Sequence, residues 1–327
     1  MSLLQPRLVY SPFEYPQAYD YWFAQQCSHW IHSEISMARD ISDWNSKLTV
    51  EQKQVIGSVL KGFTQMEVVV NDYWSHKVGQ WFKKPEIAMM TSAFASMESI
   101  HTKAYAYLNE SLGLEDFQAF MYEPTGKAKI DHLVDTKGKT KKDIARSLAV
   151  FSGFAEGVQL YSSFAILLNY SRFDLMKGVG EIVSFSVKDE SLHSTAGCWL
   201  FRVFIEENPE IWDDELKKDI FNAARDAVKL EDEFIDQVFQ DKAILDLDPK
   251  DLKQYIRYRA NTKLSDLGLK SNWKNIDMEA IERMSWFDFL TSGESHQDFF
   301  SGRVSDYSKG VVDWSDDKVY TDEVFSD

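Results

Sequence analysis

The sequence has few of the residues that form tight turns, with 15 glycines and 7 prolines among 327 residues. Together these are about half of their usual share in proteins. An all-β sandwich or barrel needs many such turns, so the shortage argues against those folds and favours long helices. Hydrophobic residues make up 44% of the chain and aromatic residues 14%. This is enough apolar surface for a core, and it excludes disorder for most of the chain.

Cysteine and positive charge are also scarce. The two cysteines, Cys27 and Cys198, cannot form a disulfide framework, and no charged-then-apolar signal opens the chain. We therefore expect a reduced, cytoplasmic protein. The 36 basic residues are outnumbered by 52 acidic ones, which gives a net charge of -16. Such a chain repels phosphate, so we expect no nucleic-acid binding.

One apolar run, from Leu148 to Tyr170, is long enough to cross a membrane. Glu156 lies near its middle, and a charge at the centre of a bilayer is costly. We therefore expect no membrane span, but a buried helix in which the Glu156 carboxylate has a partner inside the protein.

Four long segments have helical periodicity, and no segment shows the sustained alternation of a strand. Thr49 and Gln52 form a capping box at the start of the first segment, and Gly113 ends the second. Gly178 and Gly180 predict a distortion in the fourth. The expected long helices cover 49–81, 85–112, 140–172 and 176–207, with shorter helices at 14–29, 211–242 and 250–266 and a loop at 121–139. Helices of about thirty residues are ~45 Å long, and antiparallel packing around one core is the natural arrangement. The expected fold is all-α, a four-helix bundle with additional helices.

The composition changes near the C-terminus. Residues 303–327 carry ten charges, seven of them acidic, and have no apolar helical stripe. We expect one domain over 1–302 and a flexible tail over 303–327. The tail contains four aromatic residues: Tyr307, Trp314, Tyr320 and Phe325. These are either incidental in a frayed end or the anchors of a peptide that docks on a partner.

A short motif, Glu-x-x-His, occurs twice, as Glu98 to His101 and as Glu190 to His193. Residues three apart share one face of a helix, so each carboxylate and imidazole can bind the same metal ion. One copy is weak support for a metal site, because surface Glu-His pairs are common. Two copies on two separate long helices are much stronger.

The other two long helices each carry a carboxylate among apolar residues, Glu67 and Glu156. Both could point outward from amphipathic helices, but a buried acid needs a cation or another partner. Glu67 precedes Glu98 by 31 residues and Glu156 precedes Glu190 by 34, which suits two antiparallel helix pairs. Four carboxylates and two imidazoles from four helices are the ligand set of a ferritin-like di-metal carboxylate protein. Such oxygen-rich donors suit iron or manganese.

Tyr105 continues the face of the second helix, seven residues after Glu98 and four after His101. A tyrosine on a core-facing stripe is usually a packing residue. Beside an oxygen-reactive metal pair it is also an oxidisable one.

In combination, these segments resemble the small, radical-generating subunit of class I ribonucleotide reductase. The resemblance covers nearly the whole chain, in the family's order. It rests on Trp30-Ile-His-Ser-Glu34-Ile35, Glu98-Ser-Ile-His101-Thr-Lys-Ala-Tyr105, Glu156-Gly-Val-Gln-Leu-Tyr-Ser-Ser-Phe164 and Lys188-Asp189-Glu190-Ser-Leu-His193.

The resemblance implies a metal site and an activity, the reduction of ribonucleotides to deoxyribonucleotides together with a large subunit. It implies a pair of iron ions, with manganese or a mixed manganese–iron pair as alternatives, held by Glu67, Glu98, His101, Glu156, Glu190 and His193. It implies a stable radical on Tyr105 and a relay of its oxidising power through His101, Asp189 and Trp30 to a tail tyrosine. Tyr307 is the candidate for that tyrosine, because it follows the core closely.

The resemblance also implies the partners. It implies a homodimer, for which the aromatic-rich helices 85–112 and 14–29 could supply the interface. The tail would dock on a separate large catalytic subunit. One departure concerns the metals: Glu67 stands where many members of the family have Asp.

Two other functions of the same fold compete with this interpretation. A di-metal oxidase or acyl desaturase would need a channel for a long apolar substrate and no docking tail. A ferritin-like storage protein is usually about half this length. Trp30, Asp189 and Tyr307 favour the reductase subunit.

Overall fold

The computed structural model describes residues 2–114, 127–129, 131, 139–240 and 244–291. Within these ranges the chain is helical and has no strand, apart from one isolated bridge between Ile244 and Leu247. The expected all-α architecture is confirmed. The expected tail over 303–327, with Tyr307, lies outside the described residues.

The first two long helices form where the sequence predicts them. The first is α3 (Val50–Asp72), which begins at the Thr49–Gln52 capping box. It continues without a break through a π-helical segment, η2 (Tyr73–Val78), into α4 (Gly79–Trp81). The second is α5 (Pro85–Leu112), which ends at Gly113 in the left-handed conformation, with φ of 70°.

The third long helix is irregular, which the sequence did not predict. Instead of one helix over 140–172, the chain forms α8 (Lys141–Leu148), the π-helical segment η3 (Ala149–Gln159) and α9 (Tyr161–Arg172). The apolar run from Leu148 to Tyr170 is buried throughout. π-helical segments occur mostly at functional sites, and η3 carries Glu156.

The fourth long helix, α10 (Lys177–Glu207), is regular, so the expected distortion at Gly178 and Gly180 was wrong. The Asp40 carboxylate accepts hydrogen bonds from the backbone amides of Gly178 and Val179, both at 2.9 Å. Gly180 instead permits a close approach, since a Cβ there would lie 1.9 Å from Ser171 Oγ. The two glycines thus serve the start and the packing of the helix.

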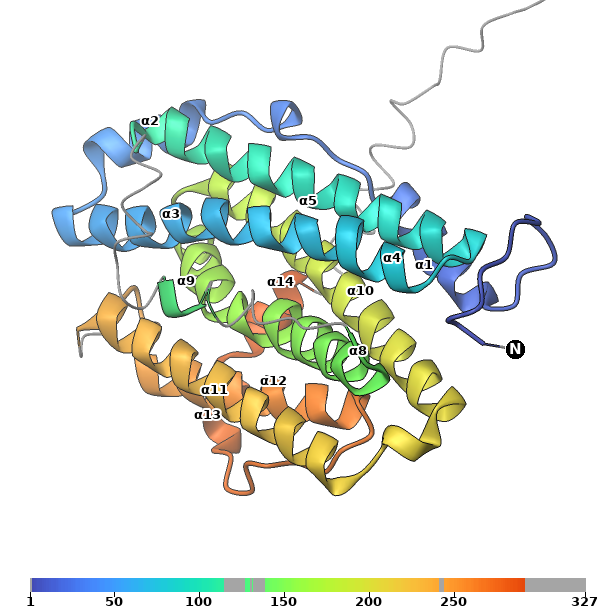
Figure 1. The fold of residues 1–327 in the computed structure, drawn as a ribbon. Helices are drawn as coiled ribbons and strands as arrows, with labels where there is room; N and C mark the ends of the chain where they lie inside the picture. The colour runs from blue at the N-terminus through green and yellow to red at the C-terminus, as the bar shows by residue number, and fades with distance from the viewer. Residues whose placement is uncertain (1, 115–126, 130, 132–138, 241–243, 292–327) are drawn as a thin grey trace, which may run out of the picture. The chain divides into compact units, whose positions relative to one another are not determined.

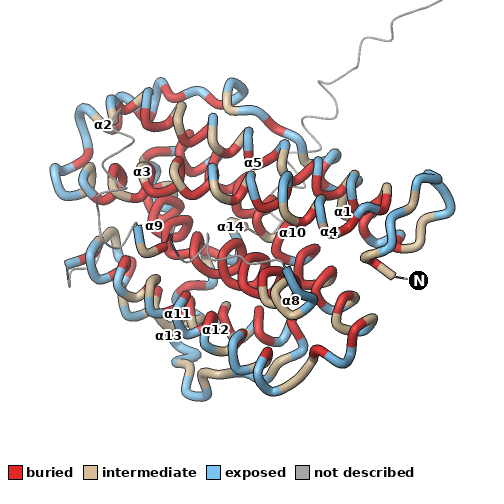
Figure 2. Tube along the Cα trace, in the orientation of Figure 1, coloured by how far each residue is buried: buried red, intermediate tan, exposed pale blue. Residues whose placement is uncertain are grey.

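These four helices form the bundle that surrounds the core. α3 packs against α5, and α10 packs against η3 and α9 (Figure 1). In Figure 2 the sides of α3 and α5 that face the bundle are buried and many of their outer positions are exposed, whereas η3 and, up to Tyr170, α9 are buried all round. The additional helices are α1 (Pro16–Cys27), α2 (Ala38–Ser46), α11 (Asp214–Phe239), α12 (Pro249–Asp266), α13 (Met278–Arg283) and α14 (Ser285–Thr291), with the short 3-10 turns η1 (His32–Glu34) and η4 (Pro209–Ile211). α1 covers α5, and α11 and α12 cover η3.

The expected loop at 121–139 falls mostly outside the described residues. Residues 127–129 are helical, and Lys129 is buried there. Its ammonium group forms an ion pair with the buried carboxylate of Glu231 on α11 and donates a hydrogen bond to the Gln159 carbonyl oxygen at 3.3 Å. This ion pair connects residues 127–129 to α11.

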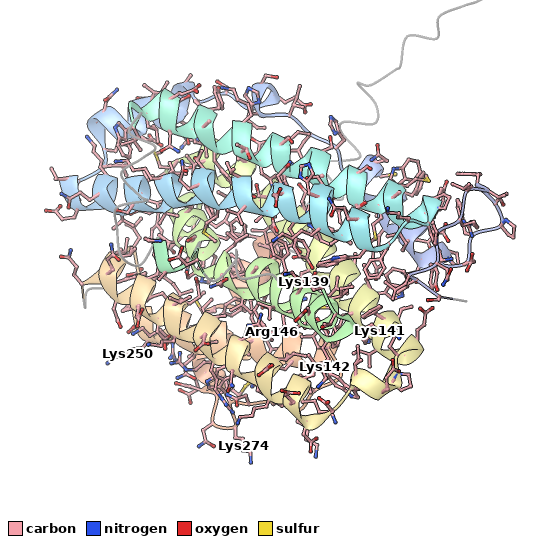
Figure 3. All side chains as sticks on the ribbon, viewed as in Figure 1. Lys139, Lys141, Lys142, Arg146, Lys250 and Lys274 are labelled. Atoms are coloured by element: carbon pink, nitrogen blue, oxygen red, sulfur yellow. The ribbon has the colours of Figure 1, made fainter. Side chains whose placement is uncertain are left out.

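Basic side chains on α8 pair with acidic groups at and after η4. Lys141 Nζ lies 3.0 Å from Glu210 Oε1, and Lys142 Nζ lies 2.6 Å from Asp213 Oδ2 (Figure 3). Exposed pairs of this kind contribute little to stability, because water screens both charges. Among the helices that the structure describes, none combines the length and hydrophobicity needed to cross a lipid bilayer.

Candidate metal centre

The six residues predicted as metal ligands converge in the middle of the bundle. Glu67 comes from α3, Glu156 from η3, and the two Glu-x-x-His pairs from α5 and α10. All six side chains are fully buried. They form two groups that share two carboxylates, and in each group the candidate ligand atoms lie within 4.8 Å of one another: Glu67, Glu98, His101 and Glu190; and Glu98, Glu156, Glu190 and His193.

The two histidines turn the same ring atom, Nδ1, towards the carboxylates. His101 Nδ1 lies 3.0 Å from Glu98 Oε2 and 3.2 Å from Glu190 Oε1. His193 Nδ1 lies 2.6 Å from Glu98 Oε1. The ring centroids of the two histidines are 6.4 Å apart. Glu98 therefore lies between the two imidazoles, and each imidazole presents a nitrogen to the same space.

Many polar atoms in this cluster have no hydrogen-bond partner among the described residues. They are Glu67 Oε1 and Oε2, Glu98 Oε1, Glu156 Oε2, Glu190 Oε1 and Oε2, and His193 Nδ1. His193 Nδ1 and Glu98 Oε1 lie close together, but the angles between them are not those of a hydrogen bond. An unsatisfied buried polar atom costs ~1–3 kcal/mol. Two divalent cations among these atoms would satisfy them and would also neutralise four carboxylates, so the cluster fits a di-metal site.

Electrostatics without a cation support the same fit. Burial raises the pKa of Glu67 and of Glu156 well above the usual range, and the neighbouring carboxylates add to the effect. Burial likewise raises the pKa of Glu190 to about 7. Burial also opposes ionisation of Glu98, but the two imidazoles beside it outweigh burial and lower its pKa below the usual range. Only one of the four carboxylates is therefore stabilised as an anion by the protein alone.

Tyr105 lies on α5 beside the cluster, as its spacing predicts. Its side chain is fully buried and stacks on Phe63 at a centroid distance of 4.7 Å, and its ring lies 6.2 Å from that of His101. The Tyr105 hydroxyl makes no hydrogen bond with the described residues. The nearby Ser186 hydroxyl donates its own proton to the Ile182 carbonyl oxygen. Burial raises the pKa of Tyr105 well above its usual value, and the Glu67 carboxylate raises it further.

Trp30 and Asp189 meet on the other side of His101. Trp30 Nε1 donates a hydrogen bond to Asp189 Oδ2 at 2.8 Å, and His101 Nε2 lies 3.1 Å from the same oxygen. The Trp30 ring stacks on the His101 ring, with centroids 5.8 Å apart. Both Trp30 and Asp189 are only 2% exposed. The structure thus brings together every predicted site residue within the described ranges; Tyr307 is outside them.

Two further residues contact the cluster and were not predicted. Trp74 Nε1 donates a hydrogen bond to Glu156 Oε1 at 2.6 Å. Its spacing of seven residues from Glu67 is the same signal that identified Tyr105 from Glu98. Gln25 on α1 hydrogen-bonds both Asp189 and His193. No sequence pattern indicates Gln25, because it lies on α1, more than 160 residues before both partners.

Comparison with known proteins identifies the family. A sequence model of the family described as ribonucleotide reductase, small chain, matches residues 7–279. The chain belongs to this family. A di-metal centre and a tyrosyl radical are the general function of its members, which separates this chain from the oxidase, desaturase and storage alternatives.

Individual relatives agree with this assignment over nearly full length. The probable ribonucleoside-diphosphate reductase small subunit of Invertebrate iridescent virus 6 is 34% identical, over 94% of this chain and 96% of the relative. The fold matches the ribonucleotide reductase R2 subunit of Clostridium botulinum with a TM-score of 0.81 at 19% identity, over 89% of this chain and 94% of that one. It also matches the dimanganese(II) NrdF of Streptococcus sanguinis with a TM-score of 0.74 at 20% identity, over 85% and 98%.

Proposed function

We propose that this chain is the radical-generating small subunit of a class I ribonucleotide reductase, with Tyr105 as the radical residue. The observation that carries the proposal is the convergence of two Glu-x-x-His pairs and two further glutamates, rich in unsatisfied atoms, beside a buried tyrosine. Reduction of ribonucleotides to deoxyribonucleotides would take place in the separate large subunit that a small subunit implies.

The proposed ligands are Glu67, Glu98, His101, Glu156, Glu190 and His193. A bound pair of iron ions would supply activation of oxygen and the oxidising power that produces the radical. Two imidazoles and four carboxylates suit iron, and equally suit manganese or a mixed pair. Glu67, in place of the commoner Asp, is compatible with this set because its carboxylate reaches the same group of atoms as Glu98 and His101.

To become a neutral radical, Tyr105 would give one electron to a bound, oxidised metal pair and one proton to a carboxylate beside it, Glu67 or Glu190. Burial and the Glu67 carboxylate raise the pKa of Tyr105, so its proton remains on the oxygen until the electron leaves. The surrounding core, including Phe63 stacked on the ring, excludes water from the radical. A stable radical needs this exclusion, because solvent and reductants would quench it.

For the relay, we propose the order Tyr105, His101, Asp189 and Trp30, and then Tyr307 in the tail. The hydrogen bonds of Asp189 to Trp30 and to His101 support the middle of this order, since they join the imidazole to an oxidisable indole through one carboxylate. Asp189 would also accept a hydrogen bond from the Nε2–H of His101, which leaves the Nδ1 atom for a metal ion.

Trp30→Phe is expected to separate radical formation from turnover. Phenylalanine retains an aromatic ring against His101 and Phe185, but it lacks the indole N–H and is much harder to oxidise. The variant should still form the Tyr105 radical, detected by electron paramagnetic resonance. It should lose ribonucleotide reduction when assayed with its large subunit. The control is Trp212→Phe, because Trp212 contacts Phe201 in another part of the chain. Full turnover by Trp30→Phe would contradict the relay.

We propose that the chain forms a homodimer. Aromatic side chains on α1 support this: Tyr19 contacts Trp22 and Phe23, and Phe23 is 54% exposed. Exposed aromatic clusters are typical of protein interfaces. Sedimentation equilibrium at micromolar concentration tests the proposal, and a monomer would contradict it.

We further propose that residues 303–327 form the contact with the large subunit. Acidic residues that keep a segment in solution alternate there with four aromatic residues that can enter pockets. Removal of the residues after Trp314 should weaken binding of the large subunit and leave the metal content and the radical intact. Tyr307→Phe should retain binding and lose turnover. Normal binding by the truncated chain, measured by surface plasmon resonance, would contradict the docking role.

A further inference from the structure

The side chain of Gln25 joins two parts of the site that are otherwise separate. Gln25 Nε2 donates a hydrogen bond to Asp189 Oδ1 at 2.8 Å, and Gln25 Oε1 lies 2.8 Å from His193 Nε2. The side chain is 2% exposed. Asp189 is already bonded to Trp30 and to His101 through its other oxygen. One hydrogen-bonded chain therefore runs from His193 through Gln25 and Asp189 to His101.

The chemistry of these groups sets the direction of each hydrogen bond. The Trp30 indole can only donate, so the Asp189 carboxylate accepts from it. The amide nitrogen of Gln25 must therefore face Asp189, and its carbonyl oxygen must face His193. A carbonyl oxygen accepts only, so His193 Nε2 carries the proton. His193 Nδ1 is then the nitrogen left to bind a metal ion, and it is the atom that faces Glu98.

From this geometry we propose that Gln25 is the positioning residue for His193. It holds the imidazole in the tautomer and orientation that present Nδ1 to a metal ion, as Asp189 does for His101. The inference rests on the proposed function, because it assigns a role toward the metal pair. It adds that α1, outside the four-helix bundle, completes the centre and that both histidines share one network.

The asymmetry of this network gives the proposal a specific consequence. Gln25 contacts His193 directly but reaches His101 only through Asp189, which has its own bond to that imidazole. Loss of the Gln25 amide should therefore weaken the ion held by the group that contains His193 and have little effect on the other. Loss of such an outer partner typically reduces metal affinity ~10–100-fold.

The test uses the full chain, prepared free of metal and titrated with Mn²⁺ under argon. Free Mn²⁺ is quantified by electron paramagnetic resonance. Methionine has about the length of glutamine without its hydrogen bonds, so the variant is Gln25→Met. It should bind one Mn²⁺ ~10–100-fold more weakly than the original chain and the other within about threefold. The double variant Gln25→Met with His193→Ala should lose no more affinity than His193→Ala alone.

Two controls separate positioning from packing. Gln26→Met changes the exposed neighbour on the same helix. Asn169→Leu removes another buried amide, which donates to the carbonyl oxygens of Ile244 and Leu245. Both should bind two Mn²⁺ ions as the original chain does. The proposal would be overturned if Gln25→Met lost no affinity for either ion, or lost the same amount for both, relative to the original chain. The same loss of affinity in Asn169→Leu would also overturn it.

A second measurement uses the original chain alone and so does not depend on the folding of a variant. Nitrogen-15 resonances of labelled histidine in the metal-free chain should show a proton on His193 Nε2. A His193 Nε2 that carries no proton in the original chain would overturn the proposal by itself, because the Gln25 carbonyl oxygen would then have no donor. If the original chain instead binds no pair of ions, the proposed function fails, while the tautomer still reports on Gln25.

Discussion

Tyr105→Phe is expected to abolish the tyrosyl radical and ribonucleotide reduction, and to leave the fold and metal binding unchanged. The change removes one hydroxyl that makes no hydrogen bond with the described residues, so no partner is left unsatisfied. The ring continues to stack on Phe63. We expect the free energy of unfolding to change by less than ~1 kcal/mol. Phenylalanine has no O–H to lose and cannot form the radical.

Tyr73→Phe is a closely matched control for this variant. Tyr73 is also buried, its hydroxyl also lacks a hydrogen-bond partner among the described residues, and its ring also stacks on a phenylalanine, Phe151. Burial raises the pKa of Tyr73 well above its usual value, as it does for Tyr105. Electron paramagnetic resonance after exposure of the reduced, iron-loaded protein to oxygen should show the signal in Tyr73→Phe and not in Tyr105→Phe. An unchanged signal in Tyr105→Phe would refute the assignment.

Much of this arrangement could be predicted because helical spacing is a local property. The Thr49–Gln52 capping box marks the start of α3, and the spacing of Glu98, His101 and Tyr105 places all three on one face of α5. Once the bundle is assumed, similar separations of the paired acids predict similar depths. The convergence of the six residues therefore followed from the pattern of two helix pairs.

Other features depend on contacts between distant segments, and the local pattern does not contain them. The π-helical segment η3 has an apolar sequence that reads as an ordinary helix. Gly180 looks like a helix breaker until Ser171 is placed against it. Gln25 is one polar residue among others on α1, and its partners appear only when α1 covers α5 and α10. Local propensity is a weak guide wherever packing determines the conformation.

Glu98→Ala is expected to remove both metal ions, whereas Glu67→Ala and Glu156→Ala should each remove one. Glu98 belongs to both groups of candidate ligands, and its two oxygens face the two imidazoles. Glu67 belongs only to the group of His101, and Glu156 only to the group of His193. Loss of a group that only hydrogen-bonds to a metal ligand already weakens metal binding ~10–100-fold. Loss of a ligand shared by both ions should therefore weaken the binding of each ion by ~100-fold or more.

The number of Mn²⁺ ions bound per chain, measured by equilibrium dialysis under argon, separates these outcomes. The original chain should bind two, Glu98→Ala none at micromolar Mn²⁺, and Glu67→Ala and Glu156→Ala one each. Circular dichroism checks that each variant retains its helices. Glu110→Ala, at an exposed position on the same helix as Glu98, is the control and should bind two. If Glu98→Ala still binds one ion at micromolar Mn²⁺, the prediction that both ions depend on Glu98 is wrong.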